Sequence, residues 1–250
     1  MNKKIRKKIK KFKLPRNKPV MIENADKKFH EKWSPSRHKL NIPSPWRCVA
    51  CGPPNSGKTF WAYQLLLFQG CDLRKGENNP YEKVLVVHCS KHTKEYDMIG
   101  AEILEEIPAP NTFDGEKKTL VILEDLALMG LSKQQNNALS RLFAFCSTHA
   151  RVDVFLTIQD WHSCPPIVRR CANLFILFPS IDNTSLQMIS KKVGMEKNDL
   201  RFLFNKYCKK KYDNIWIDNS AGGTSPFKLR LNGFDIIQKN TDASIVQRHN

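Results

Sequence analysis

The fold is decided by residues 47 to 69, RCVACGPPNSGKTFWAYQLLLFQ, in which an apolar run meets a Gly-rich turn and then a helical pattern. Gly52, Gly57, Lys58 and Thr59 fit the spacing G-x-x-x-x-G-K-[ST]. In such a loop, consecutive backbone N–H groups wrap a polyphosphate and the lysine reaches its outer phosphates. The stretch therefore predicts a phosphate-binding loop between a strand and a helix. The alternative is a chance Gly-rich turn.

The helix expected after this loop covers residues 60 to 69, and Gly70 is placed to end it. Its positive N-terminal dipole would face the bound anion. We expect the hydroxyl of Thr59 to hold Mg²⁺. The residues expected to bind the phosphates are the whole loop: Gly52, Pro53, Pro54, Asn55, Ser56, Gly57, Lys58 and Thr59.

A second anchor of the expected site is the apolar run TLVILED, residues 119 to 125, which ends in two adjacent carboxylates. A buried strand of this kind delivers its acids to the carboxyl end of the sheet, beside the phosphate loop. The usual order assigns the metal to the first acid, Glu124, and the attacking water to the second, Asp125. The common order is Asp then Glu, so the two acids here are inverted, and an exchange of their tasks remains open. The alternative is two acids that end an ordinary strand.

A third polar group follows the next apolar run, VDVFLTI at residues 152 to 158, which ends in Gln159. In P-loop ATPases with an additional strand between the two motif strands, this position holds a group that senses the γ-phosphate. Gln159 would act through hydrogen bonds made with ATP and lost with ADP. The alternative is a surface amide that closes a strand.

The remaining pattern predicts an α/β fold, a P-loop NTPase of the additional-strand (ASCE) type with a mostly parallel central sheet flanked by helices. Further strands are expected at residues 83 to 90, 173 to 178, 212 to 218 and 227 to 231. Helices are expected at residues 96 to 107, 132 to 150, 184 to 191 and 197 to 208. Ser132 is placed to cap the second of these helices.

The basic charge is concentrated at the N-terminus. The chain of 250 residues has a formal net charge of +17, and residues 1 to 19 contain ten Lys or Arg and no acid. We expect a disordered arm over residues 1 to 19, a lead-in over 20 to 45, the ATPase domain over 46 to 235 and a tail over 236 to 250. The arm suits a polyanion such as nucleic acid. The sequence does not separate this role from a nuclear-import signal, and the further alternative is a solubilising tail.

The cysteines and the apolar runs bear on metal binding and on membrane insertion. Cys48 and Cys51 have C-x-x-C spacing but no second pair at metal spacing, so the eight cysteines are expected to be reduced thiols and not zinc ligands. No apolar run approaches the length of a membrane helix, and none is expected.

The order of these motifs resembles the FtsK/HerA-type ATPases, and within them the genome-packaging ATPases of eukaryotic double-stranded DNA viruses, poxvirus-type included, with virophage and polinton-like relatives. The resemblance covers residues 46 to 234. Its specific parts are GPPNSGKT at 52 to 59, VILEDL at 121 to 126, and STHARVDVFLTIQDWHSCPPIVRRCANLFILF at 147 to 178.

The resemblance implies a Mg-dependent ATPase that moves double-stranded DNA into a preformed viral capsid. It implies that Arg151 is an arginine finger that acts on the γ-phosphate of a neighbouring subunit, with Arg169 and Arg170 as the runners-up. A finger in trans implies a homo-oligomeric ring. The implied partners are double-stranded DNA and a capsid or portal-vertex protein. The implied location is the host cytoplasm or nucleus at viral assembly sites, or the virion.

Three other functions are compatible with the motifs. A cellular-type DNA translocase or helicase shares them but usually carries a further domain. A small-molecule kinase would need an arginine-rich lid. A non-catalytic DNA-binding or capsid-associated protein would not need the intact Lys58, Thr59 and paired acids.

Overall fold

The computed structural model describes residues 45–67, 81–88, 96, 101–221, 228–233 and 235–237. All of them belong to one unit, Pro35–Asn250. The predicted arm, the lead-in before residue 45 and the tail after residue 237 lie outside the described residues. In the part of the chain that is described, no helix is both long and apolar enough to cross a membrane.

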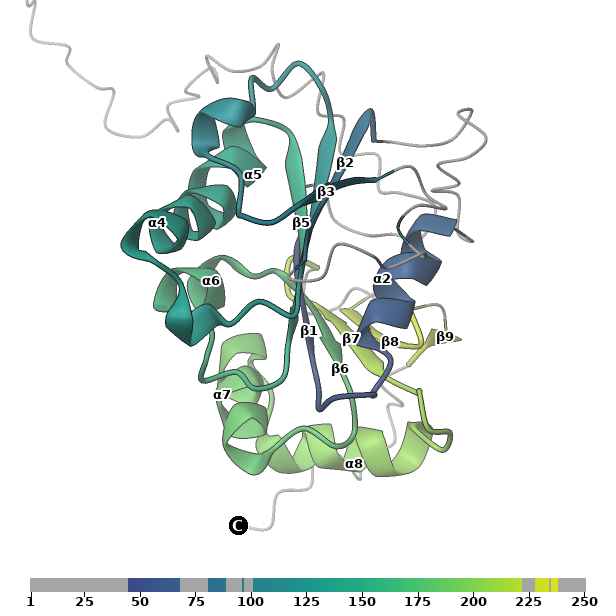
Figure 1. Ribbon diagram of the computed structural model, residues 1–250. Coiled ribbons are helices and arrows are strands. Elements are labelled where there is room, and N and C mark those ends of the chain that lie inside the picture. Colours follow the sequence, from purple (N-terminus) through teal and green to yellow (C-terminus); the bar gives the residue numbers. More distant parts are fainter. Residues whose placement is uncertain are drawn as a thin grey trace, which may run out of the picture. The chain divides into compact units, whose positions relative to one another are not determined.

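The described strands form one sheet, in the order β3-β2-β4-β5-β1-β6-β7-β8-β9 (Figure 1). The strands are β1 (Arg47–Cys51), β2 (Lys83–His88), β3 (Glu102–Leu104), β4 (Thr119–Glu124), β5 (Val152–Ile158), β6 (Leu174–Leu177), β7 (Ile215–Asp218), β8 (Leu229–Leu231) and β9 (Asp235–Ile236). The pairs from β3 to β6 are parallel, and β7, β8 and β9 are joined antiparallel at one edge. The sheet is therefore mostly parallel, as predicted.

The position of β5 gives the fold its class. β5 pairs in parallel with the P-loop strand β1 on one side and with the acid-bearing strand β4 on the other. The register places Cys51 beside Ile158, and Leu123 beside Leu156. Because all three strands run in the same direction, their carboxyl ends meet at one edge of the sheet. The additional strand thus separates the two motif strands, as the additional-strand class requires.

Helices cover both faces of this sheet (Figure 1). α4, α5, α6 and α7 lie on one face and α2 on the other. The helices are α2 (Lys58–Leu67), α4 (Lys133–Arg141), α5 (Ser147–His149), α6 (Pro166–Cys171), α7 (Asn183–Val193) and α8 (Lys197–Tyr207), with a π-helical segment η4 (Leu142–Cys146) and 3₁₀ turns η2 (Pro110–Thr112) and η3 (Leu128–Gly130).

Alternate side chains of β1 belong to two different hydrophobic cores. Val49 and Cys51 pack into the larger core with the α4 to α8 helices, whereas Cys48 and Ala50 pack into a second core with Trp61 of α2. This double burial explains why the central strands read as continuous apolar runs in the sequence. It also fixes the P-loop strand firmly at the centre of the molecule.

The helix predicted over residues 132 to 150 is confirmed, with a local π segment. Ser132 caps it as expected, since its side chain accepts a hydrogen bond from the Gln135 N–H at 3.2 Å. The helix predicted over residues 96 to 107 is wrong in its second half, where β3 (Glu102–Leu104) pairs in parallel with β2. The open edge of β2 offers backbone hydrogen bonds to this segment, and this tertiary pairing overrides its local helical pattern.

Candidate nucleotide-binding site

The P-loop leaves β1 at Gly52, whose N–H donates to the Ile158 carbonyl at 3.2 Å. A Cβ atom on Gly52 would lie 2.9 Å from Phe178 Cβ and from Ser56 Oγ, so only glycine fits there. Gly57 has a φ of +100° and Asn55 a φ of 60°. Both values are left-handed backbone, which glycine and asparagine adopt most readily. The loop geometry therefore accounts for the glycines of the motif.

The helix α2 begins at Lys58, within the motif itself. Its first backbone bond is donated by the Trp61 N–H to the Gly57 carbonyl at 3.0 Å. The N–H groups of the preceding helical residues have no carbonyl partner inside the helix. Together with the helix dipole, they make this end of α2 suitable for a phosphate group.

The Lys58 ammonium is buried beneath the loop. Its Nζ donates to the carbonyls of Gly52 at 2.7 Å and Pro53 at 2.8 Å. Burial lowers the pKa of Lys58, while the nearby Asp125 carboxylate raises it in part. The positive charge is thus held at the base of the cavity described below, where Lys58 is one of the lining residues.

Glu124 ends β4 and is only 1% exposed. The hydroxyl of Tyr96 donates a hydrogen bond to its Oε2 atom. Its Oε1 atom is buried and has no hydrogen bond of normal geometry within the described ranges. Burial raises the pKa of Glu124, and the Thr59 hydroxyl and then the His88 imidazole lower it in part. A hydroxyl beside a buried carboxylate oxygen with spare coordination fits the oxygen ligands that Mg²⁺ prefers.

Asp125, the second acid, is in a different environment. It is exposed, has a left-handed φ of 48°, and its N–H donates to Thr157 Oγ1 at 3.3 Å. One carboxylate oxygen lies 4.0 Å from Nε2 of His88, which ends β2. The left-handed turn after the buried Glu124 therefore directs the two adjacent acids differently, one into the protein and the other to its surface.

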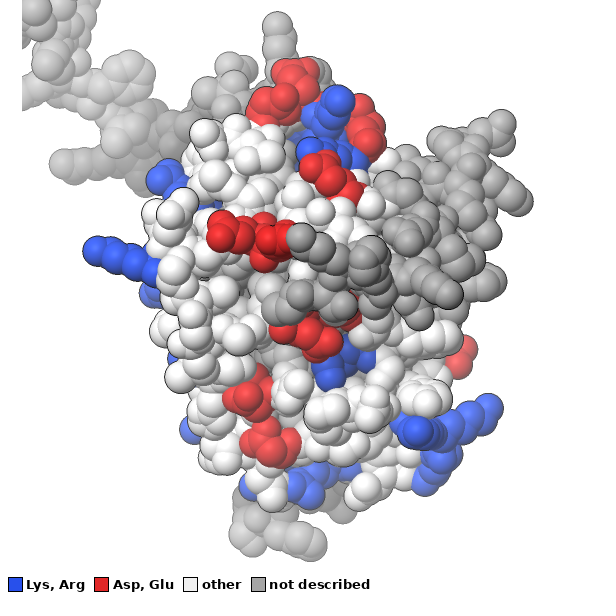
Figure 2. Space-filling model, in the orientation of Figure 1, with Lys and Arg blue, Asp and Glu red and all other residues white. Residues whose placement is uncertain are grey.

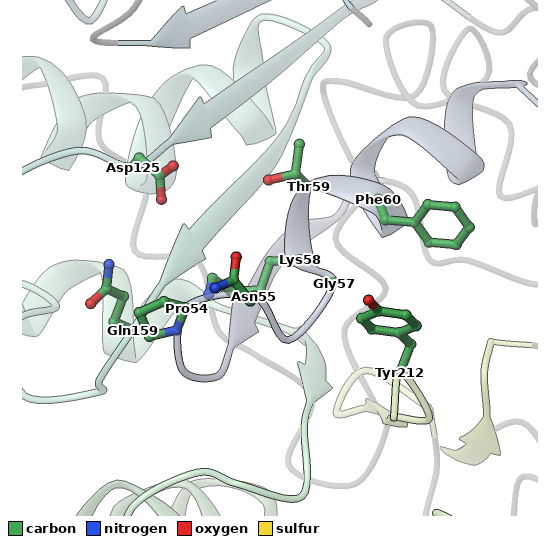
Figure 3. Close-up of a pocket in the computed structure, with 9 residues that line it drawn as sticks. All are labelled: Pro54, Asn55, Gly57, Lys58, Thr59, Phe60, Asp125, Gln159 and Tyr212. Atoms are coloured by element: carbon green, nitrogen blue, oxygen red, sulfur yellow. The ribbon is translucent and has the colours of Figure 1, made fainter. Parts of the chain in front are cut away.

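A cavity of about 570 Å³ joins most of these groups (Figure 3). The residues that line it are Pro54, Asn55, Gly57, Lys58, Thr59, Phe60, Asp125, Gln159 and Tyr212. Asp125 and Gln159 lie on one side of the loop in this view, whereas Phe60 and Tyr212 lie on the other. The structure thus brings together the P-loop, one acid and the predicted γ-phosphate sensor.

Arg151 is not part of this assembly. It precedes β5 and therefore lies at the amino edge of the sheet, where its Nη1 donates to the Glu116 carbonyl at 2.8 Å. The seven residues of β5 separate it from Gln159, and a strand of that length spans about 23 Å. Arg151 is too far along the strand to reach the cavity of its own subunit.

The two runner-up arginines occupy the last turn of α6. Arg169 is half-buried and Arg170 is exposed. Burial raises the pKa of Cys164 to about 12, and the charge of Arg169 lowers it in part, which places Arg169 near that thiol. Neither arginine lines the cavity around the P-loop.

Three aromatic residues of the site were not predicted from the sequence. Phe60 directly follows the motif, but its position in a helix predicted nothing more than helical packing. Tyr212 follows three lysines, and its Cδ1 atom lies 3.2 Å from where a Cβ on Gly57 would be. Tyr96 contacts Glu124 from a segment with no motif. The contacts of Tyr212 and Tyr96 join residues far apart in the chain, and no local sequence pattern predicts them.

No protein-family model matches the sequence, and no protein of curated function matches it. Solved structures of similar fold exist. One is B204, the DNA-packaging ATPase of Sulfolobus turreted icosahedral virus, with 15% identity and a TM-score of 0.53 over 79% of this chain and 100% of that chain. Another is the genome-packaging NTPase B204 of Sulfolobus turreted icosahedral virus 2 in complex with sulfate, with 17% identity and a TM-score of 0.52 over 78% of this chain and 98% of that chain.

At this level of identity the likeness concerns the fold. It agrees with the strand order, in which β5 lies between the P-loop strand and the strand that ends in Glu124. The predicted fold class is confirmed, and the two similar structures are viral genome-packaging enzymes, the type of protein that the motifs resemble. The chain has the P-loop NTPase fold of the additional-strand type that is found in viral genome-packaging ATPases.

Proposed function

We propose that the protein is an ATP-hydrolysing double-stranded DNA translocase that packages a viral genome into a preformed capsid. The observation that carries the proposal is the cavity that joins Lys58, Thr59, Asp125 and Gln159 at the carboxyl edge of the sheet. Lys58 and Thr59 come from the P-loop, Asp125 follows the acid-bearing strand β4, and Gln159 follows β5. Their convergence on one space is what nucleotide hydrolysis requires.

The residues of the P-loop bind and orient the phosphates. The N–H groups at the start of α2 and the Lys58 ammonium supply positive potential at the base of the cavity. Thr59 and Glu124 would hold Mg²⁺, which neutralises charge on the phosphates when it is bound. This fit is supported by the Thr59 hydroxyl beside Glu124 and by the buried Oε1 atom of that carboxylate, which has no hydrogen bond of normal geometry among the described residues.

The environments of the two acids support the division of tasks expected from their order. Glu124 is buried beside Thr59, the other residue expected to hold the metal. Asp125 faces the cavity together with Gln159, where it can orient and polarise a water molecule for attack on the γ-phosphate. Gln159 lines the same cavity, and its amide would hydrogen-bond that phosphate and transmit its loss to β5.

The placement of Arg151 supports an intersubunit site. An arginine at the amino edge of the sheet cannot act on the nucleotide of its own subunit, but it is available to a neighbour in a ring. We propose that Arg151 stabilises charge on the neighbour's γ-phosphate in the transition state. Arg169 and Arg170 remain the alternatives for this role.

The proposed partners are double-stranded DNA and a capsid or portal-vertex protein. The names of the two structures of similar fold support DNA packaging, and the net charge of +17 supports a polyanionic partner. On the face shown in Figure 2, basic and acidic side chains of the described residues are interspersed. The charge argument for DNA therefore rests mainly on the basic residues 1 to 19, which lie outside the described residues.

A triplex-displacement assay tests translocation directly. The full chain, Mg²⁺ and ATP are mixed with a duplex that carries a third strand, and release of that strand is followed over time. We expect release by the wild type and by Lys191→Ala, an exposed lysine on α7, and none by Lys58→Ala. Release that needs no ATP, or that Lys58→Ala still performs, would contradict the proposal.

A further inference from the structure

Two aromatic rings lie exposed at one end of the cavity. Phe60 is 53% exposed and Tyr212 is 50% exposed, although large aromatic side chains are usually buried. Phe60 packs edge-to-face with Trp61, with 6.5 Å between the ring centroids. Neither ring belongs to a hydrophobic core formed by the described residues, so packing among those residues does not explain their position.

Tyr212 is held in a well-defined turn. Oδ2 of the next residue, Asp213, accepts hydrogen bonds from the N–H groups of Lys209 at 2.8 Å and Lys210 at 2.7 Å. The Tyr212 carbonyl accepts a further bond from Asn214 Nδ2 at 3.0 Å. A ring on such a restrained turn loses little conformational freedom when it binds a ligand.

The direction of the cavity indicates which part of a nucleotide these rings meet. The phosphates are expected at the start of α2, with the terminal phosphate beside Asp125 and Gln159. Figure 3 shows Phe60 and Tyr212 on the opposite side of the loop from those two residues. A nucleotide that extends away from its terminal phosphate therefore brings its sugar and base towards the two rings.

We infer that Phe60 and Tyr212 form the platform on which the base of the bound nucleoside triphosphate stacks. This inference rests on the proposed nucleotide-binding function. The Tyr212 ring contacts the P-loop at Gly57, and the ammonium of Lys211 lies 5.1 Å from its centroid. About half of each of the two side chains is exposed and available for contact with a base.

The chemistry of the platform predicts its selectivity. Stacking recognises the flat face that every base has, and larger purines gain more contact than pyrimidines. Discrimination between adenine and guanine needs polar groups at the base edge. Among the residues that line the cavity, the platform end supplies aromatic faces, and the side chains of Asn55, Asp125 and Gln159 lie towards the phosphate end. The platform should therefore favour purine over pyrimidine triphosphates without distinguishing adenine from guanine.

Isothermal titration of the full chain with ATP and with tripolyphosphate, in Mg²⁺ and without DNA, tests the platform. Tyr212→Ala should weaken ATP binding by about 5- to 150-fold, the loss of one stacked base, and leave tripolyphosphate binding unchanged. Tyr212→Phe should retain both affinities. Phe60→Ala should act in the same direction as Tyr212→Ala. An unchanged ATP affinity in both alanine variants, or an equal loss for both ligands, would overturn the platform.

Two control variants test the stacking platform separately from the proposed nucleotide-binding function. Phe202→Ala removes an aromatic ring of similar exposure on α8, and both affinities should stay at the wild-type value. Lys58→Ala should lower the affinity for both ligands; if it lowers neither, the nucleotide site itself is wrong. If the wild type fails to translocate DNA but Tyr212→Ala weakens ATP binding and not tripolyphosphate binding, the stacking platform is supported and only the DNA-translocase function is contradicted.

Discussion

The phenol hydroxyl of Tyr96 donates a hydrogen bond to Oε2 of Glu124, the buried carboxylate that ends β4. This contact joins the proposed metal ligand to a segment that carries no recognised motif. A hydrogen bond to the charged form of a carboxylate lowers its pKa and opposes the effect of burial. Tyr96 is therefore a positioning residue for the acid that would hold the metal.

Tyr96→Phe removes only the hydroxyl. The pKa of Glu124, already raised by burial, should rise further because the ionised form loses a donor. Hydrolysis requires ionised Glu124, so the acidic limb of the pH–rate profile should move to higher pH. Loss of this bond should also cost about 1 kcal/mol of the free energy of unfolding. An unchanged acidic limb, measured from pH 5 to 9, would show that Tyr96 supports only the fold.

Glu124→Gln and Asp125→Asn should separate the tasks of the two acids. Glu124→Gln should weaken Mg²⁺-dependent ATP binding, because Glu124 lies beside Thr59. Asp125→Asn should retain ATP binding and lower the hydrolysis rate by about 100- to 10,000-fold, the typical contribution of a general base. Binding by titration and single-turnover hydrolysis distinguish the two outcomes. The reverse pattern would assign the metal to Asp125.

The same glutamate makes stability depend on pH. Because burial raises its pKa in the folded state, ionised Glu124 destabilises the fold, and this cost appears as the pH rises above the ordinary carboxyl pKa. Glu124→Gln removes the ionisation. Its unfolding temperature relative to wild type should therefore be higher at pH 8 than at pH 4. A relative stability that does not change between these pH values would contradict the raised pKa.

Gly52→Ala tests the close packing of the P-loop. The new methyl group would lie 2.9 Å from Phe178 Cβ and from Ser56 Oγ, so the loop must shift. We expect a loss of about 1 to 3 kcal/mol in the free energy of unfolding, as in other overpacked sites, and weaker ATP binding. Gly130→Ala is the matched control, because a methyl group there has no neighbour within 4 Å. Equal unfolding midpoints in urea would be evidence against a tightly packed loop.

Arg151→Ala tests action between subunits. The variant should bind ATP as the wild type does, because Arg151 lies at the far end of β5 from the cavity. Its hydrolysis rate should fall by about 1,000-fold or more if it is an arginine finger. Mixing it with Lys58→Ala subunits should restore part of the activity, since some interfaces then combine an intact P-loop with an intact finger. Absence of rescue at every mixing ratio would exclude Arg151 and direct the test to Arg169 and Arg170.

The sequence was sufficient for those parts of the structure that local chemistry determines. The glycines at residues 52 and 57 predict the P-loop, and the apolar β-branched runs predict the central strands. Because the carboxyl ends of parallel strands meet at one edge, the sequence predicts that Asp125 and Gln159 lie beside the loop.

The parts that the sequence did not reveal depend on contacts between distant segments. The strand β3 exists because the edge of β2 accepts it, and no local pattern distinguishes that outcome from a helix. Tyr96 and Tyr212 reach the site from segments far from the motifs they touch. The role proposed for Arg151 depends on a second subunit, which a single chain does not contain.

The rate of ATP hydrolysis by the full chain in Mg²⁺, with and without double-stranded DNA, tests the central claim most directly. We predict that the wild type and Lys191→Ala hydrolyse ATP, that duplex DNA raises the rate, and that Lys58→Ala has almost no activity in either condition. Equal hydrolysis by wild type and Lys58→Ala, or a wild-type rate that duplex DNA leaves unchanged, would contradict the assignment of this chain as a DNA-translocating ATPase.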